Sequence, residues 1–168
     1  MSELAAEKQL AEIKQLIEET DRLPVPTLEI IGEEQLEAHW QSLLVYFLKE
    51  TYPHGFGTDV LTAFLNAIET EQGTTFERGL NDISQVDVQT EVPTGNGPVD
   101  VLLSLDDKWF ICIELKVRSP ETGNQTVRYA NATTLGNLVV SEFDGTREYL
   151  DLAPEAASSP SSDDFVEI

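Results

Sequence analysis

The stretch F-I-C-I-E-L-K-V-R, residues 110–118, indicates which kind of fold the chain forms. Apolar residues alternate along it, and successive side chains of a β-strand point to opposite faces of the sheet. The apolar face of the predicted strand carries Ile111, Ile113, Leu115 and Val117. Glu114 and Lys116 project together from the other face, so this strand pairs a core-forming side with a charged one.

A second strand is predicted just before it, over residues 99–105. Its apolar face carries Val99, Val101 and Leu103. Directly opposed residues of an antiparallel pair share a face. A two-residue turn would pair Asp100 with Ile113 and place an acid beside the core, whereas a three-residue loop over residues 106–108 would pair Asp100 with Glu114. We therefore predict a loop of odd length or a bulge.

With that register, two carboxylates and one ammonium converge at Asp100, Glu114 and Lys116. Hard oxygen ligands of this kind suit Mg²⁺, which keeps several waters beside one or two carboxylates. Such an ion can lower the pKa of a bound water and neutralise charge on a phosphate. Lys116 can orient the attacking hydroxide or stabilise the transition state. The backbone carbonyl of Leu115 is a further candidate ligand. The alternative is a solvated strand face with a Glu–Lys ion pair.

Local patterns predict the other elements. Helices are expected over residues 2–20, 33–51, 121–133 and from residue 58 or 59 up to Gly73, and strands over residues 86–92, 138–143 and 165–168. Asp144-Gly145 is typical of a hairpin turn. The Pro-rich residues 23–27 break the first helix. We therefore expect an N-terminal helix and linker over residues 1–27 and one α/β domain over residues 28–168; a homodimer through the first helix is an alternative.

Several motifs together resemble one family. G-P-V-D at residues 97–100, followed by E-L-K at residues 114–116, fits a D…(D/E)-x-K signature. N-Q-T-V-R-Y at residues 124–129 looks like a Q-x-x-R-Y helix, and Glu37 precedes a Pro-His-Gly turn at residues 53–55. In this order they resemble the PD-(D/E)XK nuclease superfamily, in the prokaryotic branch with a Q-x-x-R-Y helix. The resemblance covers roughly residues 33–150.

The resemblance implies an α/β fold of the restriction-endonuclease type, a mixed β-sheet flanked by helices with an N-terminal helical segment. It implies hydrolysis of DNA phosphodiester bonds by metal-activated water, with Mg²⁺ or Mn²⁺. The implied metal ligands are Asp100, Glu114, Leu115 and Glu37, the catalytic residues are Asp100, Glu114, Lys116 and Gln125, and the substrate-binding residues are Arg118, Arg128 and Tyr129. Members usually continue past a comparable final strand, so we expect a shortened C-terminus. The alternative function is an inactive nuclease-fold module that binds nucleic acid or protein.

Composition sets the remaining expectations. The 168 residues carry 31 acids and 10 Lys or Arg, a net charge of −21, which opposes DNA binding because basic residues supply most non-specific affinity. Either the surface is adapted to concentrated salt or the partner is basic. The single cysteine excludes an intrachain disulfide, and two histidines without a cysteine partner are too few for a zinc site. Without a secretory signal or a long apolar run, we expect a cytoplasmic protein without membrane association.

Overall fold

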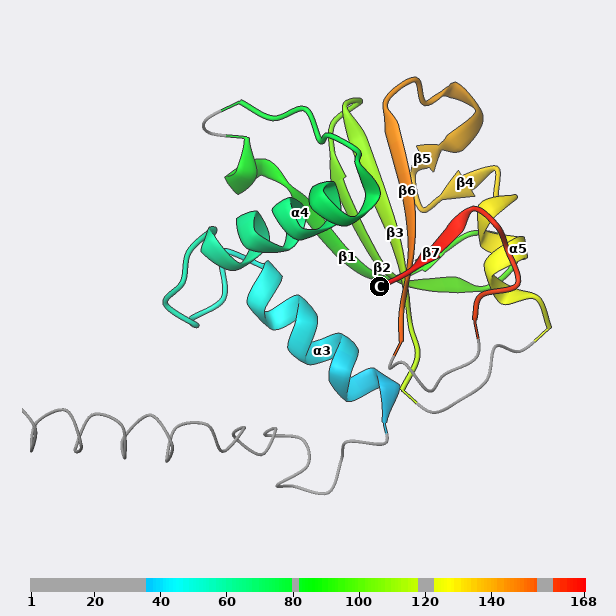
Figure 1. Cartoon of the computed structure of the whole chain (residues 1–168), viewed down its shortest axis with the longest axis horizontal. Coiled ribbons are helices and arrows are strands. Elements are labelled where there is room, and N and C mark those ends of the chain that lie inside the picture. Colours follow the sequence, from blue (N-terminus) through cyan, green and yellow to red (C-terminus); the bar gives the residue numbers. More distant parts are fainter. Residues whose placement is uncertain (1–35, 80–81, 118–122, 154–158) are drawn as a thin grey trace, which may run out of the picture. The chain divides into compact units, whose positions relative to one another are not determined.

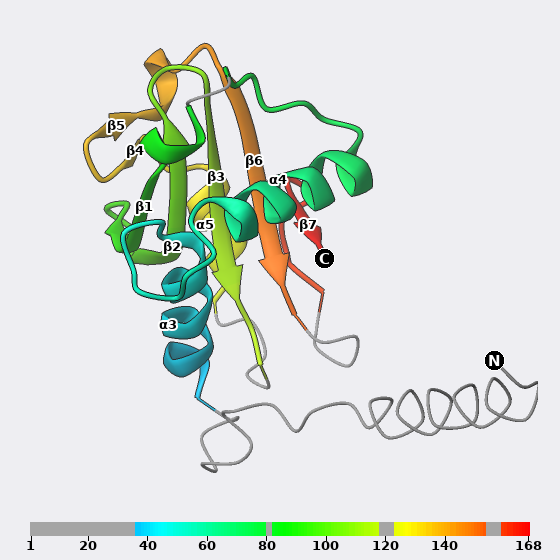
Figure 2. The same cartoon turned by 90° about the vertical axis from the view of Figure 1, so that its left-hand side faces the viewer.

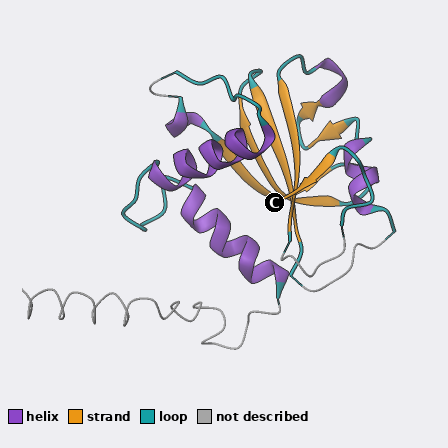
Figure 3. Cartoon of the chain, in the orientation of Figure 1, coloured by secondary structure: helices purple, strands orange, loops and turns teal. Residues whose placement is uncertain are grey.

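A computed structural model describes residues 36–79, 82–117, 123–153 and 159–168. The predicted helix over residues 2–20, its Pro-rich linker and Arg118 lie outside the described residues. Figure 3 shows a set of neighbouring strands with helices around it. The restriction-endonuclease-like α/β arrangement that the sequence predicts is confirmed, because the sheet is mixed and flanked by helices.

Two helices precede the sheet in the chain. Helix α3 spans Glu37–Leu48 and ends there because Lys49 adopts an extended backbone conformation. Helix α4 spans Asp59–Gln72, with Thr58 at its N-cap, as the sequence predicts. Gly73 terminates α4 in the left-handed conformation, φ 63°, which glycine adopts without a steric penalty. The buried residues of the two helices are Gln41, Val45, Leu48, Leu61, Leu65 and Ile68.

The main sheet has five strands in the order β1-β2-β3-β6-β7 (Figure 1). They span Asp87–Pro93, Pro98–Leu105, Trp109–Leu115, Thr146–Leu152 and Phe165–Glu167. The first three pair antiparallel, while β6 runs parallel to β3 and β7 parallel to β6. A short 3-10 helix, Ile83–Gln85, leads into β1. The chain therefore changes from a hairpin-built half to a parallel half at β3.

The connection from β3 to β6 contains helix α5, Gln125–Ala130, the two-stranded β4–β5 hairpin, Thr134–Leu135 and Leu138–Val139, and a 3-10 helix, Val140–Glu142. The strand predicted over residues 138–143 is thus only two residues long. The hairpin predicted at Asp144-Gly145 is wrong, because β6 pairs parallel to β3. Gly145 instead permits a close backbone approach, since a Cβ there would lie 2.3 Å from the carbonyl oxygen of Lys108.

Two apolar clusters cover the two faces of the sheet. The first joins α3 and α4 to residues such as Val101, Ile111 and Ile113, and Figure 2 shows α4 passing across β3 and β6. The second joins α5 and the β4–β5 segment to residues such as Leu102, Phe110 and Cys112. Strand β3 is buried along its whole length. No helix of the described residues is long and apolar enough to cross a bilayer.

Candidate active site

Asp100 lies near the start of β2 and Glu114 near the end of β3, so both acids are at the same end of this antiparallel pair. The ladder pairs Val101 with Ile113 and leaves residues 106–108 as the connecting loop. One step further in this register places Asp100 opposite Glu114. The predicted three-residue loop is therefore confirmed. Val101 and Ile113 both point into the core under α3 and α4. The neighbouring residues Asp100 and Glu114 therefore belong to the opposite face of the sheet.

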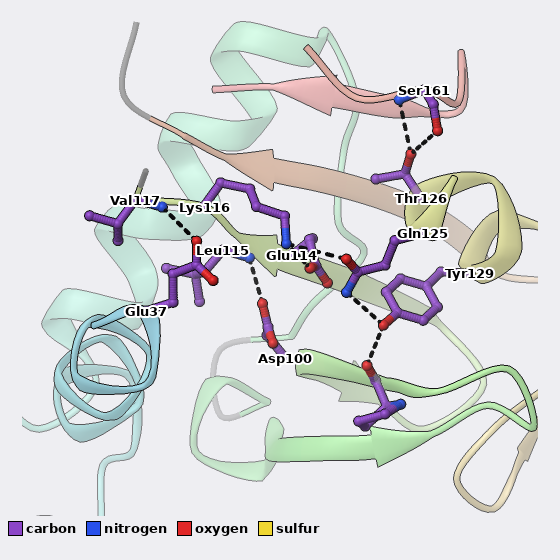
Figure 4. Close-up of polar contacts among 11 residues, drawn as sticks. Glu37, Asp100, Glu114, Leu115, Lys116, Val117, Gln125, Thr126, Tyr129 and Ser161 are labelled. Atoms are coloured by element: carbon purple, nitrogen blue, oxygen red, sulfur yellow. Dashed lines mark hydrogen bonds and ion pairs between the residues drawn. The ribbon is translucent and has the colours of Figure 1, made fainter. Parts of the chain in front are cut away.

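The Asp100 carboxylate is fixed to the neighbouring strand by a backbone hydrogen bond. Its Oδ2 accepts from the N–H of Leu115 at 2.7 Å (Figure 4). Asp100 is half-buried and Leu115 is buried. The acid carried by β2 is therefore held directly beside the strand that carries the second acid.

Lys116 and Glu114 form a buried ion pair. The Nζ of Lys116 donates to Oε1 of Glu114 at 2.5 Å, and the two residues are only 8% and 1% exposed. The second carboxylate oxygen of Glu114, Oε2, is buried and has no hydrogen-bond partner among the described residues. An unsatisfied carboxylate oxygen in the interior is costly unless another group binds it. The site therefore offers one oxygen anchored by a protein donor and one available to a ligand.

The electrostatics follow from this burial. Desolvation, followed by the neighbouring charge of Asp100, raises the pKa of Glu114 from 4.5 to about 7. Desolvation likewise raises the pKa of Asp100, against the opposing effect of the Leu115 N–H. Burial alone would lower the pKa of Lys116, but the bond to Glu114 and the charges of Glu37 and Asp100 outweigh it and raise that pKa. Lys116 is thus an ammonium beside two acids, Asp100 and Glu114, whose pKa values are raised.

Helix α5 contributes a chain of hydrogen bonds that ends at Lys116 (Figure 4). The Tyr129 hydroxyl donates to the carbonyl of Pro98 at 2.5 Å and accepts from Nε2 of Gln125 at 2.8 Å. Because its amide nitrogen is so engaged, Gln125 turns Oε1 toward Lys116, whose Nζ donates to it at 3.3 Å. Thr126 anchors the same helix, since its Oγ1 accepts from the N–H groups of Ser161 and Ser162.

The other predicted site residues lie at different distances from this centre. Glu37, at the start of α3, accepts from the N–H of Val117 at 3.2 Å, and its charge contributes to raising the pKa values of both Asp100 and Lys116. Tyr129 is only 2% exposed, which leaves little of it for direct contact with a substrate. Arg128 is exposed on α5.

His54 belongs to a separate cluster of the Pro-His-Gly turn. Its Nδ1 accepts from the N–H of Phe56 at 3.1 Å, so its Nε2 carries the proton and donates to the carbonyl of Lys49 at 2.9 Å. The ring packs against Tyr46, Phe47 and Phe56. These contacts give His54 a structural role in closing the turn between α3 and α4.

Three polar residues near the site are missed by reasoning from sequence. Asp151 of β6 is the ladder partner of Glu114, is 2% exposed, and its charge adds to the raised pKa of Glu114. Gln41, one turn after Glu37 on α3, donates to the carbonyl of Asp100. Glu91 of β1 accepts from the same amide. For Gln41 the helical spacing from Glu37 is a usable signal; for the others nothing local points to the site.

The donor set suits a hard divalent cation. Asp100 and Glu114 bring two carboxylates together, and Glu114 Oε2 is a buried oxygen for which the described residues provide no partner. Within the described ranges, no group of three or more His, Cys, Asp or Glu side chains is arranged to hold a metal ion. A divalent ion bound here would have Asp100 and Glu114 as its principal carboxylate ligands.

Comparison with known proteins identifies the family. Residues 25–164 match the model of the PD-(D/E)XK nuclease superfamily. The chain belongs to this superfamily. The match spans the candidate site from Glu37 to Asp151, and membership indicates nuclease-type function. Neither a curated protein nor a solved structure gave a match. The narrower assignment to the branch with a Q-x-x-R-Y helix stays a prediction.

Proposed function

We propose that the protein is a metal-dependent nuclease that hydrolyses the phosphodiester bonds of DNA at the site formed by Asp100, Glu114 and Lys116. The observation that carries the proposal is the Glu114 carboxylate, which is 1% exposed, bound through one oxygen to Lys116 at 2.5 Å and buried without a described partner at the other. Asp100 stands opposite it. Membership in the superfamily supports the same chemistry.

The cofactor in this proposal is Mg²⁺, with Mn²⁺ as an alternative. Asp100 and Glu114 would hold it, with Glu37 and the carbonyl of Leu115 as additional ligands. When bound, it would supply a Lewis acid that activates water and neutralises charge on the phosphate. Glu37 has one oxygen at the N–H of Val117, which leaves its other oxygen for this purpose.

Lys116 is assigned the role of the catalytic cation. Its raised pKa keeps it protonated at neutral pH, so it donates hydrogen bonds to negative charge that develops on the phosphate. Gln125 accepts a hydrogen bond from the Lys116 ammonium. Its role in the site is therefore to orient that ammonium. Tyr129, buried and bonded to Gln125, is assigned to positioning rather than to substrate contact.

The exposed Arg128, on the helix that carries Gln125, is assigned to the DNA backbone, and Arg118 to the same role. A guanidinium suits a phosphate because its N–H donors match the oxygens in pairs. The net charge of −21 opposes this contact at low ionic strength, and salt screens the opposition. Activity is therefore expected to need salt as well as the cation.

The test is cleavage of plasmid and single-stranded DNA with Mg²⁺ or Mn²⁺ over a range of salt, comparing wild type with Lys116→Ala. Lys108→Ala is the matched control, because Lys108 is also ion-paired, to Asp82 at 2.5 Å, but lies in the β2–β3 loop away from the site. We expect metal-dependent cutting that Lys116→Ala abolishes and Lys108→Ala retains. Absence of cutting by the wild type with either ion at every salt concentration would favour the inactive binding module instead.

A further inference from the structure

Strands β1 and β2 both change the face they present at one pair of residues. Val88 and Val101 belong to the core under α3 and α4, whereas Val92 and Val99 belong to the core under α5. In a regular strand, residues two or four positions apart share a face. Alternation is therefore broken between Val88 and Val92 on one strand and between Val99 and Val101 on the other.

The break is centred on Glu91 and Asp100. The ladder pairs Thr90 with Val101 and Val92 with Val99, which places Glu91 opposite Asp100. Glu91 has φ 51°, in the left-handed region that a residue with a Cβ occupies only at a cost. Strand β1 is therefore irregular at the residue opposite Asp100, whose carboxylate accepts from the N–H of Leu115.

One side chain from α3 spans the break. The Nε2 of Gln41 donates to the backbone carbonyl of Asp100 at 2.7 Å and to Oε1 of Glu91 at 3.1 Å. Gln41 is 7% exposed and is the one polar residue among the buried residues of α3. A buried amide needs partners to offset its desolvation, and Gln41 finds them at the two residues that form the break.

We propose that Gln41 is a positioning residue that sets the direction of the Asp100 carboxylate. The inference deepens the proposed nuclease function and rests on it for the purpose of the carboxylate, but the positioning itself does not depend on catalysis. Glu37, one helical turn earlier, accepts from the N–H of Val117 just beyond β3. Helix α3 thus holds the two strands that carry Asp100 and Glu114 through two side chains on one of its faces.

The first measurement needs no metal and no substrate. Gln41→Met keeps the length and apolar bulk of the side chain and removes both donated hydrogen bonds. Hydrogen exchange of the Leu115 amide, followed by NMR, reports its bond to Asp100 Oδ2. Val45→Ala is the control, because it removes core contacts from the same helix without touching Asp100. We expect Leu115 to exchange about tenfold faster or more in Gln41→Met than in Val45→Ala at equal global stability.

The second measurement is the affinity for Mn²⁺, titrated without DNA. Loss of a residue that orients a metal-binding carboxylate typically weakens binding by about 10- to 100-fold, so Gln41→Met should do so while Val45→Ala should not. If Gln41→Met does not fold, Gln41→Glu serves, because an ionised carboxylate cannot donate to Asp100 and repels Glu91.

The two measurements separate this inference from the proposed function. Leu115 exchange that is the same in the Gln41 variant and in Val45→Ala would overturn the positioning role, whatever the protein does with Mn²⁺. Fast Leu115 exchange in a protein whose wild type binds no Mn²⁺ would retain the positioning role and reject the metal site.

Discussion

Glu114 and Asp151 are ladder partners on the parallel strands β3 and β6, and both are buried, at 1% and 2% exposure. Asp151 on one side and Asp100 on the other both add to the raised pKa of Glu114. Lys116 supplies positive charge to this group at 2.5 Å. The protonation of Glu114 is therefore coupled to the charges of Asp100, Lys116 and Asp151.

The stability of the metal-free protein should fall as pH rises through this titration. A carboxyl group whose folded pKa is about 7 instead of 4.5 binds its proton more tightly in the folded state. The resulting decrease in the free energy of unfolding is absent below pH 4.5 and grows between pH 4.5 and 7. Above pH 7 it stays constant, at up to about 3 kcal/mol. Urea unfolding at pH 5 and pH 8 should show this difference in wild type and a smaller one in Glu114→Gln. An equal pH dependence in both proteins would show that Glu114 is not the group responsible.

A divalent cation should reverse this effect. Mg²⁺ at about 100 times its dissociation constant is expected to stabilise the folded state by about 2.7 kcal/mol, and more Mg²⁺ should be needed at pH 6 than at pH 8 because Glu114 must release a proton to bind it. Thermal unfolding measures both. Asp100→Asn should abolish the stabilisation, while Asp107→Asn, an exposed acid of the β2–β3 loop, controls for binding to the acidic surface. Equal stabilisation of both variants would locate the ions elsewhere.

The backbone strain at Glu91 can be isolated by a pair of substitutions. Glu91→Ala and Glu91→Gly both remove the acceptor for Gln41, but only glycine adopts φ 51° without a Cβ clash. The glycine variant should therefore be more stable than the alanine variant by about 1 kcal/mol, in contrast to the usual preference against glycine in strands. Denaturant unfolding of the two variants tests this. A more stable alanine variant would mean that Glu91 does not hold the left-handed conformation in solution.

Tyr129 and Arg128 should differ in which kinetic constant they affect. Tyr129→Phe removes the hydroxyl that fixes Gln125 and Pro98, so kcat should fall by about 10- to 100-fold with little change in KM, because the ring is buried. Arg128→Ala removes an exposed cation and should mainly raise KM, more so at low salt. Steady-state kinetics on a short duplex separate the two. An unchanged kcat in Tyr129→Phe would reject the positioning role of the α5 hydrogen-bond chain.

Local patterns were sufficient for the hairpin that carries the two main acids. Parity along residues 101–105 and 110–118 left one loop length that kept Asp100 out of the core, and the structure has that loop. The face predicted for Val99 is wrong, because Val99 packs in the core under α5 while Val101 and Leu103 pack in the other. The limits of α4 followed from its cap and from Gly73. These features depend on residues close together in the chain, where sequence spacing and spatial arrangement are directly related.

Features that depend on long-range packing could not be predicted in this way. Asp144-Gly145 has the composition of a hairpin turn, but the glycine is needed because the chain passes against Lys108. Glu91 adopts a conformation that its residue type disfavours, so only its surroundings explain it. The Q-x-x-R-Y pattern points to Tyr129 but not to its burial, which comes from the second core.

The central strand gives the protein an internal reporter of its own opening. Cys112, the single cysteine, lies in β3 with no exposed surface, and desolvation holds its thiol pKa far above the ordinary range. A thiol reacts through its thiolate and only where a reagent reaches it. Alkylation of the unmodified protein can therefore occur only when the sheet separates. Its rate measures how often β3 becomes accessible, so a variant that alters only the side chains of the site should leave that rate unchanged.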